Sequence, residues 1–286
     1  MYRTQLVLAA AIAIVGAGGC TGQSPPSAKP ADEHAGHGQA ANKNDHAAGG
    51  HRAGEAMELM VSTKPQELQV GQPTKLSLML HDAAGKMLKE FDVTHEKLAH
   101  FILIREGLDE FAHVHPEVDA KGNITIEHTF PVAGNYHVFL DYQPKGGAAA
   151  TAHQQINVLG DVAAAPALQV NVPGNIAIDN LVAKVSLKSG SENTVASFEL
   201  RDADGTAVTD LQPYLGAMGH LVVVSADGAK YVHAHPLTET PGSNEVKFAV
   251  HFPAPGLYKM WGQFQRDDKI ITIPAVAEYG SAEHAH

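Results

Sequence analysis

The sequence of 286 residues predicts an all-β fold, with two tandem β-sandwich domains after a disordered N-terminal tether. Short apolar segments rich in β-branched residues recur at regular spacing between Gly, Asp, Asn and Pro, which is typical of sandwich strands. No segment has the periodicity of an amphipathic helix. One unit also occurs twice, because the pattern of residues 100–116 returns at residues 220–236.

Residues 1–19 have the composition of a bacterial lipoprotein signal peptide. Arg3 supplies a positive charge, residues 6–15 form an apolar run too short to span a bilayer, and small residues follow. Residues 17–20, Ala-Gly-Gly-Cys, resemble a lipobox, and Cys20 is the only cysteine. We therefore expect Cys20 to be lipidated, with palmitate among its acyl groups, and Thr21 after it favours the periplasmic face of the outer membrane. The alternative is an ordinary signal peptide with an incidental cysteine.

Both ends of the chain are rich in histidine and have no regular spacing of hydrophobic residues. Residues 20–56 are of low complexity and lack hydrophobic periodicity, so we expect a disordered tether, and residues 280–286 form a similar tail. Such tracts bind metal ions weakly, although a purely polar tether is an equal alternative. Their histidines are His34, His37, His46, His51, His284 and His286.

The remainder divides into a first domain at residues 57–160, a linker at 161–166 and a second domain at 167–279. In the first domain we expect strands at residues 67–70, 74–81, 99–105, 110–115, 123–130, 134–142 and 153–159. In the second we expect strands at residues 168–172, 182–187, 194–201, 220–225, 231–235, 245–252, 256–264 and 269–273. The apolar content of 44% lets each domain form a core without a disulfide.

Three histidines recur at the same spacing in both domains. In each copy one histidine precedes a His-x-His-Pro sequence by thirteen residues. Apolar runs at 101–104 and 221–224 predict a buried strand, and Gly107 or Gly228 marks the turn into a second strand. Side chains at i and i+2 of a strand share a face, so the paired histidines project together and the hairpin returns them to the first. The following proline places each pair at a strand end or an edge.

Three converging imidazoles form a ligand set for copper or zinc, so the spacing predicts one metal site in each domain. Most surrounding side chains differ between the copies while all three histidines remain, which favours metal binding. The alternative is a structural role, in which the histidines only hold the hairpin. The expected ligands are His100, His113 and His115 in one site and His220, His233 and His235 in the other.

Four further residues are weaker candidate ligands. Met218 lies two residues before a triad histidine, and a thioether there would favour Cu(I), although core packing is the alternative. His137 has a lysine as its counterpart in the second copy. His128 and His251 fall one residue out of register with each other.

A Phe-Pro-x-x-Gly-x-Tyr step occurs in both copies and resembles the strand entry of immunoglobulin-like modules, so Tyr136 and Tyr258 are candidate corner tyrosines. Together with the His-x-His-Pro hairpin and the lipobox, it resembles a group of bacterial secreted and lipoprotein β-sandwich domains. More distantly the chain is similar to the YtkA-like and CopC-like copper-associated proteins of the periplasm. The resemblance implies an immunoglobulin- or cupredoxin-like sandwich and copper handling, but the CopC-like ligand spacing is not reproduced.

The predicted function is metal binding in the cell envelope rather than catalysis. The net charge of −11 argues against nucleic acid as a partner and is compatible with cations. We expect copper, as Cu(II) or Cu(I), with zinc as the other candidate, to be bound for buffering, tolerance or delivery to a transport partner. Because Cys20 is the only cysteine, the folded part has no cysteine ligand and cannot form a blue-copper site.

Two other functions stay open. A structural or interaction lipoprotein needs no metal. An enzyme of the copper or cupin type is the third hypothesis, because Gly107 begins a Gly-x5-His-x-His stretch and Asp119 lies shortly after it. The second domain does not reproduce that pattern.

Overall fold

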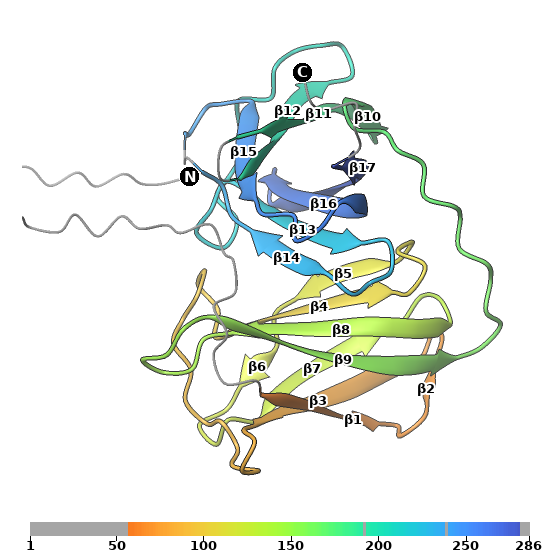
Figure 1. Ribbon diagram of the computed structural model, residues 1–286, viewed down its shortest axis with the longest axis vertical. Helices are drawn as coiled ribbons and strands as arrows, with labels where there is room; N and C mark the ends of the chain where they lie inside the picture. Colours follow the sequence, from red (N-terminus) through yellow and green to blue (C-terminus); the bar gives the residue numbers. More distant parts are fainter. Residues whose placement is uncertain (1–56, 191–192, 238–239, 281–286) are drawn as a thin grey trace, which may run out of the picture. The chain divides into compact units, whose positions relative to one another are not determined.

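The computed structural model describes residues 57–190, 193–237 and 240–280 (Figure 1). Every regular element within them is a strand, which confirms the all-β prediction. None of these residues forms a helix long and apolar enough to cross a membrane. The expected signal peptide, the lipidated Cys20, the tether and residues 281–286 of the tail lie outside the described residues.

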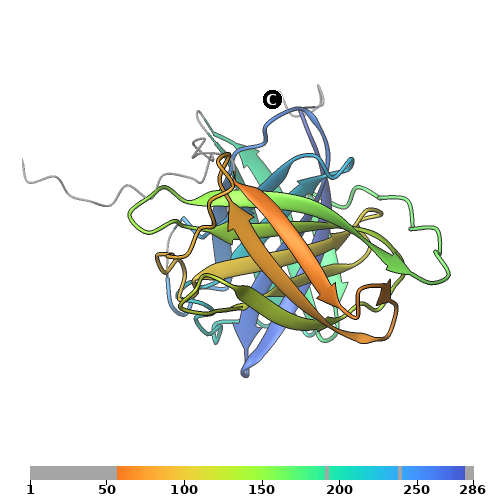
Figure 2. The ribbon, with the colours of Figure 1, turned by 90° about the horizontal axis from the view of Figure 1, so that it is seen from below.

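The first nine strands form a two-sheet sandwich, called here the N-terminal sandwich. One sheet has the order β1 (Glu58–Lys64), β3 (Pro73–His81), β7 (Ile124–Thr129) and β6 (Glu117–Val118). The other has the order β2 (Leu68–Gln69), β9 (Ala150–Leu159), β8 (Gly134–Tyr142), β4 (Ala99–Arg105) and β5 (Phe111–Val114). Figure 2 shows β1 and β3, in orange, side by side on the outer face of this sandwich.

The last eight strands form the C-terminal sandwich in the same way. Its outer sheet has the order β10 (Gly174–Ile178), β11 (Leu181–Ser189), β12 (Thr194–Asp202) and β15 (Glu245–Val250). The other has the order β14 (Tyr231–Ala234), β13 (His220–Ser225), β16 (Gly256–Arg266) and β17 (Lys269–Tyr279). The hairpin strands β5 and β14 both lie at a sheet edge. This position agrees with the prediction made from the proline after each histidine pair.

The strand predictions were wrong at a few places. The predicted strands do not include β1, β6 or β10, and residues 168–172 form no strand. Asn171 and Val172 both donate their backbone N–H groups to the carbonyl of Val276, so this segment makes a local contact rather than a ladder. Pro173 follows and has no N–H with which to continue the pairing.

Both predicted corner tyrosines make the expected contact. The Tyr136 hydroxyl donates to the carbonyl of Val132 at 2.8 Å, and the Tyr258 hydroxyl donates to that of Ala254 at 2.7 Å. Each bond spans four residues and closes the turn that enters β8 or β16. The two sandwiches therefore share this immunoglobulin-like feature.

The two sandwiches pack against each other through β4 and β13. Alternate side chains of these strands face opposite ways, so one face of each strand lies in its own core and the other lies at the interface. Phe101 and Leu103 point into the core of the N-terminal sandwich. Ile102 and Ile104 point the other way, into a third apolar cluster shared with the C-terminal sandwich. All seven residues of β4 are buried, and residues 101–104 form an apolar run without alternation because both faces are covered.

Aromatic pairs at this interface follow the repeat. Phe111 stacks on Trp261 with ring centroids 4.7 Å apart. In the reciprocal contact, Tyr231 stacks on Phe139 at 4.3 Å. The repeat relates Phe111 to Tyr231 and Phe139 to Trp261, so each sandwich presents the same surface to the other. The interface is thus pseudosymmetric.

Gly228, at the turn of the β13–β14 hairpin, is required by this interface. It has a φ of +71°, and a Cβ added there would fall on the ring of His137 from the other sandwich. We expect Gly228→Ala to lower the free energy of unfolding by about 1–3 kcal/mol, as measured by urea denaturation. Gly205→Ala is the control, because Gly205 also has a positive φ but no atom within 4 Å of an added Cβ. Equal losses in the two variants would show that the close approach contributes nothing.

Candidate metal centre

The predicted histidines lie on the faces through which the two sandwiches meet. His100 is on β4, on the same face as Ile102, while His113 is on β5 and His115 follows that strand directly. The repeat places the other three in the same way on and after β13 and β14. We call His100, His113 and His115 the N-terminal triad, and His220, His233 and His235 the C-terminal triad.

The two triads form one cluster between the sandwiches. Ring centroids are 4.8–5.4 Å apart within the N-terminal triad and 4.8–5.7 Å apart within the C-terminal triad. Across the interface the ring of His233 lies 5.1 Å from that of His113 and 5.6 Å from that of His100. The sequence predicts two separate sites, whereas the structure brings all six imidazoles together.

Backbone carbonyls fix the tautomer of the first histidine in each triad. His100 Nε2 lies 2.9 Å from the carbonyl oxygen of Thr94, and His220 Nε2 lies 2.8 Å from that of Tyr214. Because a carbonyl oxygen only accepts, each Nε2 carries the hydrogen. The Nδ1 atom of each ring therefore keeps its lone pair.

Side chains from the opposite sandwich fix the second histidine in each triad. His233 Nδ1 lies 2.8 Å from Asp141 Oδ2, and His113 Nδ1 lies 2.7 Å from Gln263 Oε1. Both oxygens accept, so Nδ1 of each ring donates and Nε2 keeps the lone pair. Each of these contacts also joins one sandwich to the other.

These tautomers turn the lone pairs toward the middle of each triad. His100 Nδ1 and His113 Nε2 lie only 3.2 Å apart, although neither carries a hydrogen. Four further triad nitrogens are buried and lack a hydrogen-bond partner: His115 Nε2, His220 Nδ1, His233 Nε2 and His235 Nε2. A buried acceptor without a partner costs about 1–3 kcal/mol, which a bound cation would offset.

The spacing of the nitrogens suits a metal ion. In each triad, one nitrogen from each histidine lies within 4.8 Å of the other two. A tetrahedral ion with bonds of about 2.0–2.1 Å needs nitrogens about 3.3 Å apart. The separation of 3.2 Å between His100 Nδ1 and His113 Nε2 is close to that value. Each triad could therefore hold one metal ion and leave a fourth position open.

Burial keeps these imidazoles neutral. It lowers the pKa of His220 to about 3 and that of His115 to about 4. Burial, and after it the neighbouring histidines, hold the pKa of His113 and of His233 well below the ordinary 6.5. Since an imidazole must be deprotonated to bind a metal, the cluster is in its binding form at neutral pH.

A family model described as Domain of unknown function (DUF8832) matches residues 54–160 and again residues 178–280. The chain belongs to this family. Each match contains one complete triad, so the repeat in the sequence is a repeat of the DUF8832 domain. No curated protein matches the sequence. The DUF8832 match is neither to a YtkA-like nor to a CopC-like family, so that more distant likeness stays a prediction.

Solved structures resemble the DUF8832 chain only weakly. FdeC, an adhesin of Escherichia coli, is 18% identical over 78% of this chain and 65% of its own, with a TM-score of 0.26. TarS of S. aureus is 10% identical over 76% of this chain and 39% of its own, with a TM-score of 0.22. The chain thus spans less than two thirds of either protein. A carbohydrate-binding module of the β-sandwich superfamily is 12% identical over 79% of this chain and 99% of its own, with a TM-score of 0.23. At these scores the likenesses do not bear on what the DUF8832 chain binds.

His95 is a seventh histidine at the cluster that the sequence analysis missed. Its ring stacks on that of His235 with centroids 3.5 Å apart, and it lies 6.1 Å from His100. It occupies a tight turn with Glu96, and both residues have positive φ values, 50° and 64°. The repeat comparison could not reveal it, because Leu215 stands at the equivalent position of the second copy. Its place five residues before a triad histidine was the available signal.

The weaker histidine candidates, His137, His128 and His251, do not belong to either triad. His137 Nδ1 is 3.1 Å from His153 Nε2, and the two rings stack. His128, on β7, makes an edge contact with the ring of Phe130, and His251 is exposed. Met218 is buried and belongs to the apolar core of the C-terminal sandwich, and its role as a ligand stays a prediction.

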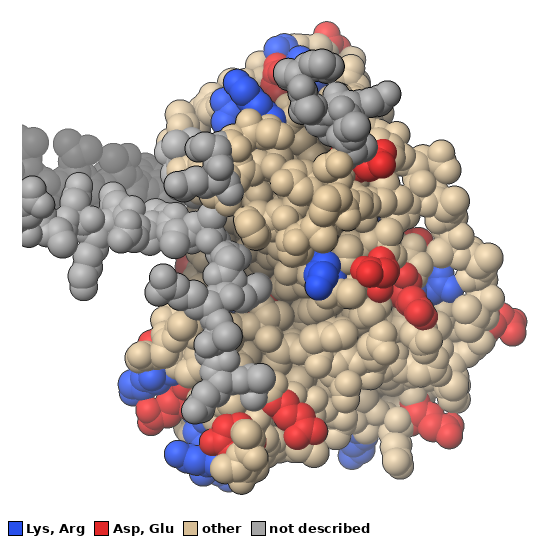
Figure 3. Space-filling view, in the orientation of Figure 1, with Lys and Arg blue, Asp and Glu red and all other residues tan. Residues whose placement is uncertain are grey.

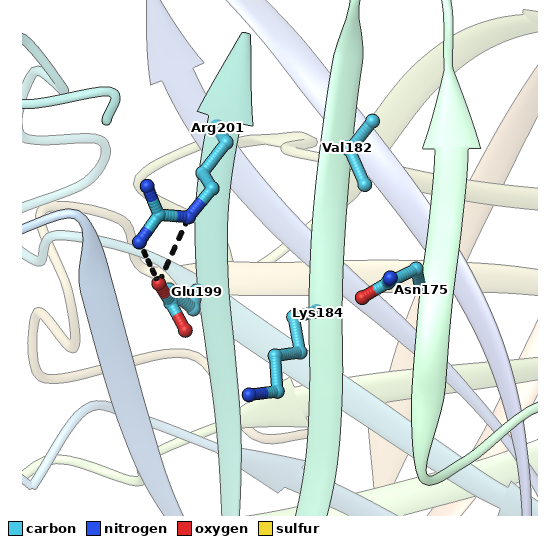
Figure 4. Close-up of a pocket in the computed structure, with 5 residues that line it drawn as sticks. All are labelled: Asn175, Val182, Lys184, Glu199 and Arg201. Atoms are coloured by element: carbon cyan, nitrogen blue, oxygen red, sulfur yellow. Dashed lines mark hydrogen bonds and ion pairs between the residues drawn. The ribbon is translucent and has the colours of Figure 1, made fainter. Parts of the chain in front are cut away.

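The surface away from the cluster offers a shallow pocket of about 260 Å³ on the outer sheet of the C-terminal sandwich (Figure 4). Arg201 donates to Glu199 there, at 2.6 Å from Nη2. The pocket is formed by β10, β11 and β12, the sheet that carries none of the triad histidines. On the face shown in Figure 3, basic and acidic side chains are interspersed. The histidine cluster is therefore the feature with a defined chemistry.

Proposed function

We propose that this DUF8832 chain binds two metal ions, one in each triad, and that copper is the ion it handles. The observation that carries the proposal is the inward arrangement of neutral, buried lone pairs whose tautomers are fixed from outside by Thr94, Tyr214, Asp141 and Gln263. A histidine that only held a hairpin would have no need of a second buried nitrogen without a partner.

The donor set favours copper over other divalent ions. Imidazole suits copper, zinc and nickel, and copper leads the order of affinities among first-row divalent metals. Asp141 is the one carboxylate that hydrogen-bonds a triad histidine among the described residues. The donors are thus almost uncharged, which lowers the cost of holding Cu(I) relative to a doubly charged ion. Zinc is the main competitor.

The biological role that we infer is storage or transfer of copper in the cell envelope, with the chain anchored through Cys20. The export signal and the histidine-rich tether in the sequence support this role. Binding and transfer need no nucleophile or base, and we assign no catalysis to the cluster.

A structural function is the second candidate, and one observation favours it. The bonds from His113 to Gln263 and from His233 to Asp141 join the two sandwiches without any metal. On this hypothesis the cluster stabilises the interface of an interaction protein. Metal titration separates the two functions.

The test is titration of the full chain with Cu(II), Cu(I) and zinc, after the six histidines of the tether and tail have been changed to serine. We expect two ions to bind per chain. Changing His115 and His235 to alanine removes one ligand from each triad and keeps the interface hydrogen bonds of His113 and His233. This change should weaken binding by more than the roughly 10- to 100-fold that loss of an outer partner costs.

Changing His128 and His251 to alanine is the matched control, because both lie outside the triads and should leave affinity unchanged. Absence of binding by the chain with serine in its tails would contradict the proposal and leave the structural function.

A further inference from the structure

The two triads have different outer partners at equivalent positions. Asp141 on β8 pairs with His100 in the strand register, and Gln263 on β16 pairs with His220. Each then reaches across the interface to the second histidine of the other triad. The C-terminal triad thus has a carboxylate as the outer hydrogen-bond partner of His233, whereas the N-terminal triad has an amide as the outer partner of His113.

Asp141 is held in place by three donors. Its Oδ2 accepts from His233 Nδ1 at 2.8 Å and from the Tyr231 hydroxyl at 2.6 Å, and its Oδ1 accepts from the Thr151 hydroxyl at 2.5 Å. The Asp141 side chain is only 16% exposed, so solvent screens its charge little. This geometry gives His233 a fixed negative charge behind its ring.

Gln263 is also held by two hydrogen bonds of its side chain, but it carries no charge. Its side-chain amide donates to the Thr272 hydroxyl at 3.2 Å, while its oxygen accepts from His113 Nδ1 at 2.7 Å. The two outer partners therefore accept from their rings at similar distances, 2.8 Å for Asp141 and 2.7 Å for Gln263. Their main difference is the charge of Asp141.

A carboxylate behind a ligating imidazole makes the ring a stronger donor and offsets the charge of the ion. An amide oxygen supplies a dipole alone. Lys97 adds to the difference, because its positive charge acts on His100 and His115 of the N-terminal triad. The charge of Asp141 also acts on His100, but its hydrogen bond goes to His233.

We propose that the two triads bind metal unequally, with the C-terminal triad as the tighter site that fills first and the N-terminal triad as the weaker, exchangeable site. Asp141 and Gln263 are the positioning residues that set this order, each from the opposite sandwich. The inference rests on the proposed function and adds to it a resident ion and a transferable ion.

The test measures each triad alone in the full chain with serine in its tails, with zinc as a probe that has no redox chemistry. His115→Ala leaves the C-terminal triad complete, and His235→Ala leaves the N-terminal triad complete. Competition with a chelator should show that the His115→Ala chain binds zinc about 10- to 100-fold more tightly than the His235→Ala chain.

The outer partners are then exchanged. Asp141→Asn in the His115→Ala chain should weaken binding by about 10- to 100-fold, and Gln263→Glu in the His235→Ala chain should strengthen it by a similar factor. A gain of affinity at the N-terminal triad cannot arise from a damaged fold. Equal affinities of the two single-triad chains, or no response to either exchange, would overturn the inference while two-ion binding still stood. Absence of zinc binding by the unsubstituted triads would overturn the inference, and absence of copper binding as well would overturn the proposed function.

Discussion

Replacing Trp261 with alanine is expected to lower the free energy of unfolding by about 3–5 kcal/mol and to weaken metal binding at both triads. The Trp261 side chain is 4% exposed and belongs to the apolar cluster between the sandwiches, where it stacks on Phe111. Its removal leaves a cavity in the interface that orients Asp141 and Gln263 across it. Urea unfolding followed by circular dichroism measures the first effect, and zinc competition measures the second.

Phe198→Leu is the control for this variant. Phe198 is fully buried in the core of the C-terminal sandwich, where its ring packs against those of Phe248 and Phe264. It should destabilise the chain but leave metal affinity unchanged. If Trp261→Ala also left metal affinity unchanged, the triads would not depend on the interface.

Acidification of the metal-free chain is expected to lower its stability steeply below pH 6.5. An unfolded histidine takes up its proton near pH 6.5, whereas burial holds the pKa of His220 at about 3 and that of His115 at about 4 in the folded chain. The unfolded chain therefore binds more protons between these values. Stability is full above pH 6.5 and falls as the pH falls, by about 1.4 kcal/mol per pH unit for each buried histidine concerned.

Trp261, the only tryptophan, lies at the interface and gives the readout. Chemical unfolding in the presence of a chelator, followed by its fluorescence at about pH 7.5, 6 and 5, measures the effect. His233→Gln removes one buried histidine and should make the dependence shallower. A stability that stayed constant from neutral pH to about pH 5 would contradict the expectation.

The local parts of this structure follow from the sequence because their causes are local. A period of two places His113 and His115 on one face, and the thirteen-residue spacing returns them to His100. The corner tyrosines follow from a turn motif of seven residues. Strands β1, β6 and β10 were missed, since two of them are short and their residues lack the long apolar run of β4.

The joining of the two triads depends on contacts that no local pattern encodes. The unbroken apolar run of β4 predicts that both faces of the strand are buried. It does not predict that the C-terminal sandwich buries the second face. Asp141 and Gln263 occupy equivalent positions with different side chains. A comparison of the two copies that seeks identical residues therefore misses Asp141 and Gln263, although these two residues distinguish the triads.

The pseudosymmetric interface also bears on the history of the chain. A single DUF8832 sandwich could present the same surface to a second copy of itself, and such a two-fold dimer repeats every contact identically. Both triads would then carry the same outer partner, so the two sites would have to bind alike. Joining the copies in one chain removes that identity and lets one position become aspartate while its equivalent becomes glutamine.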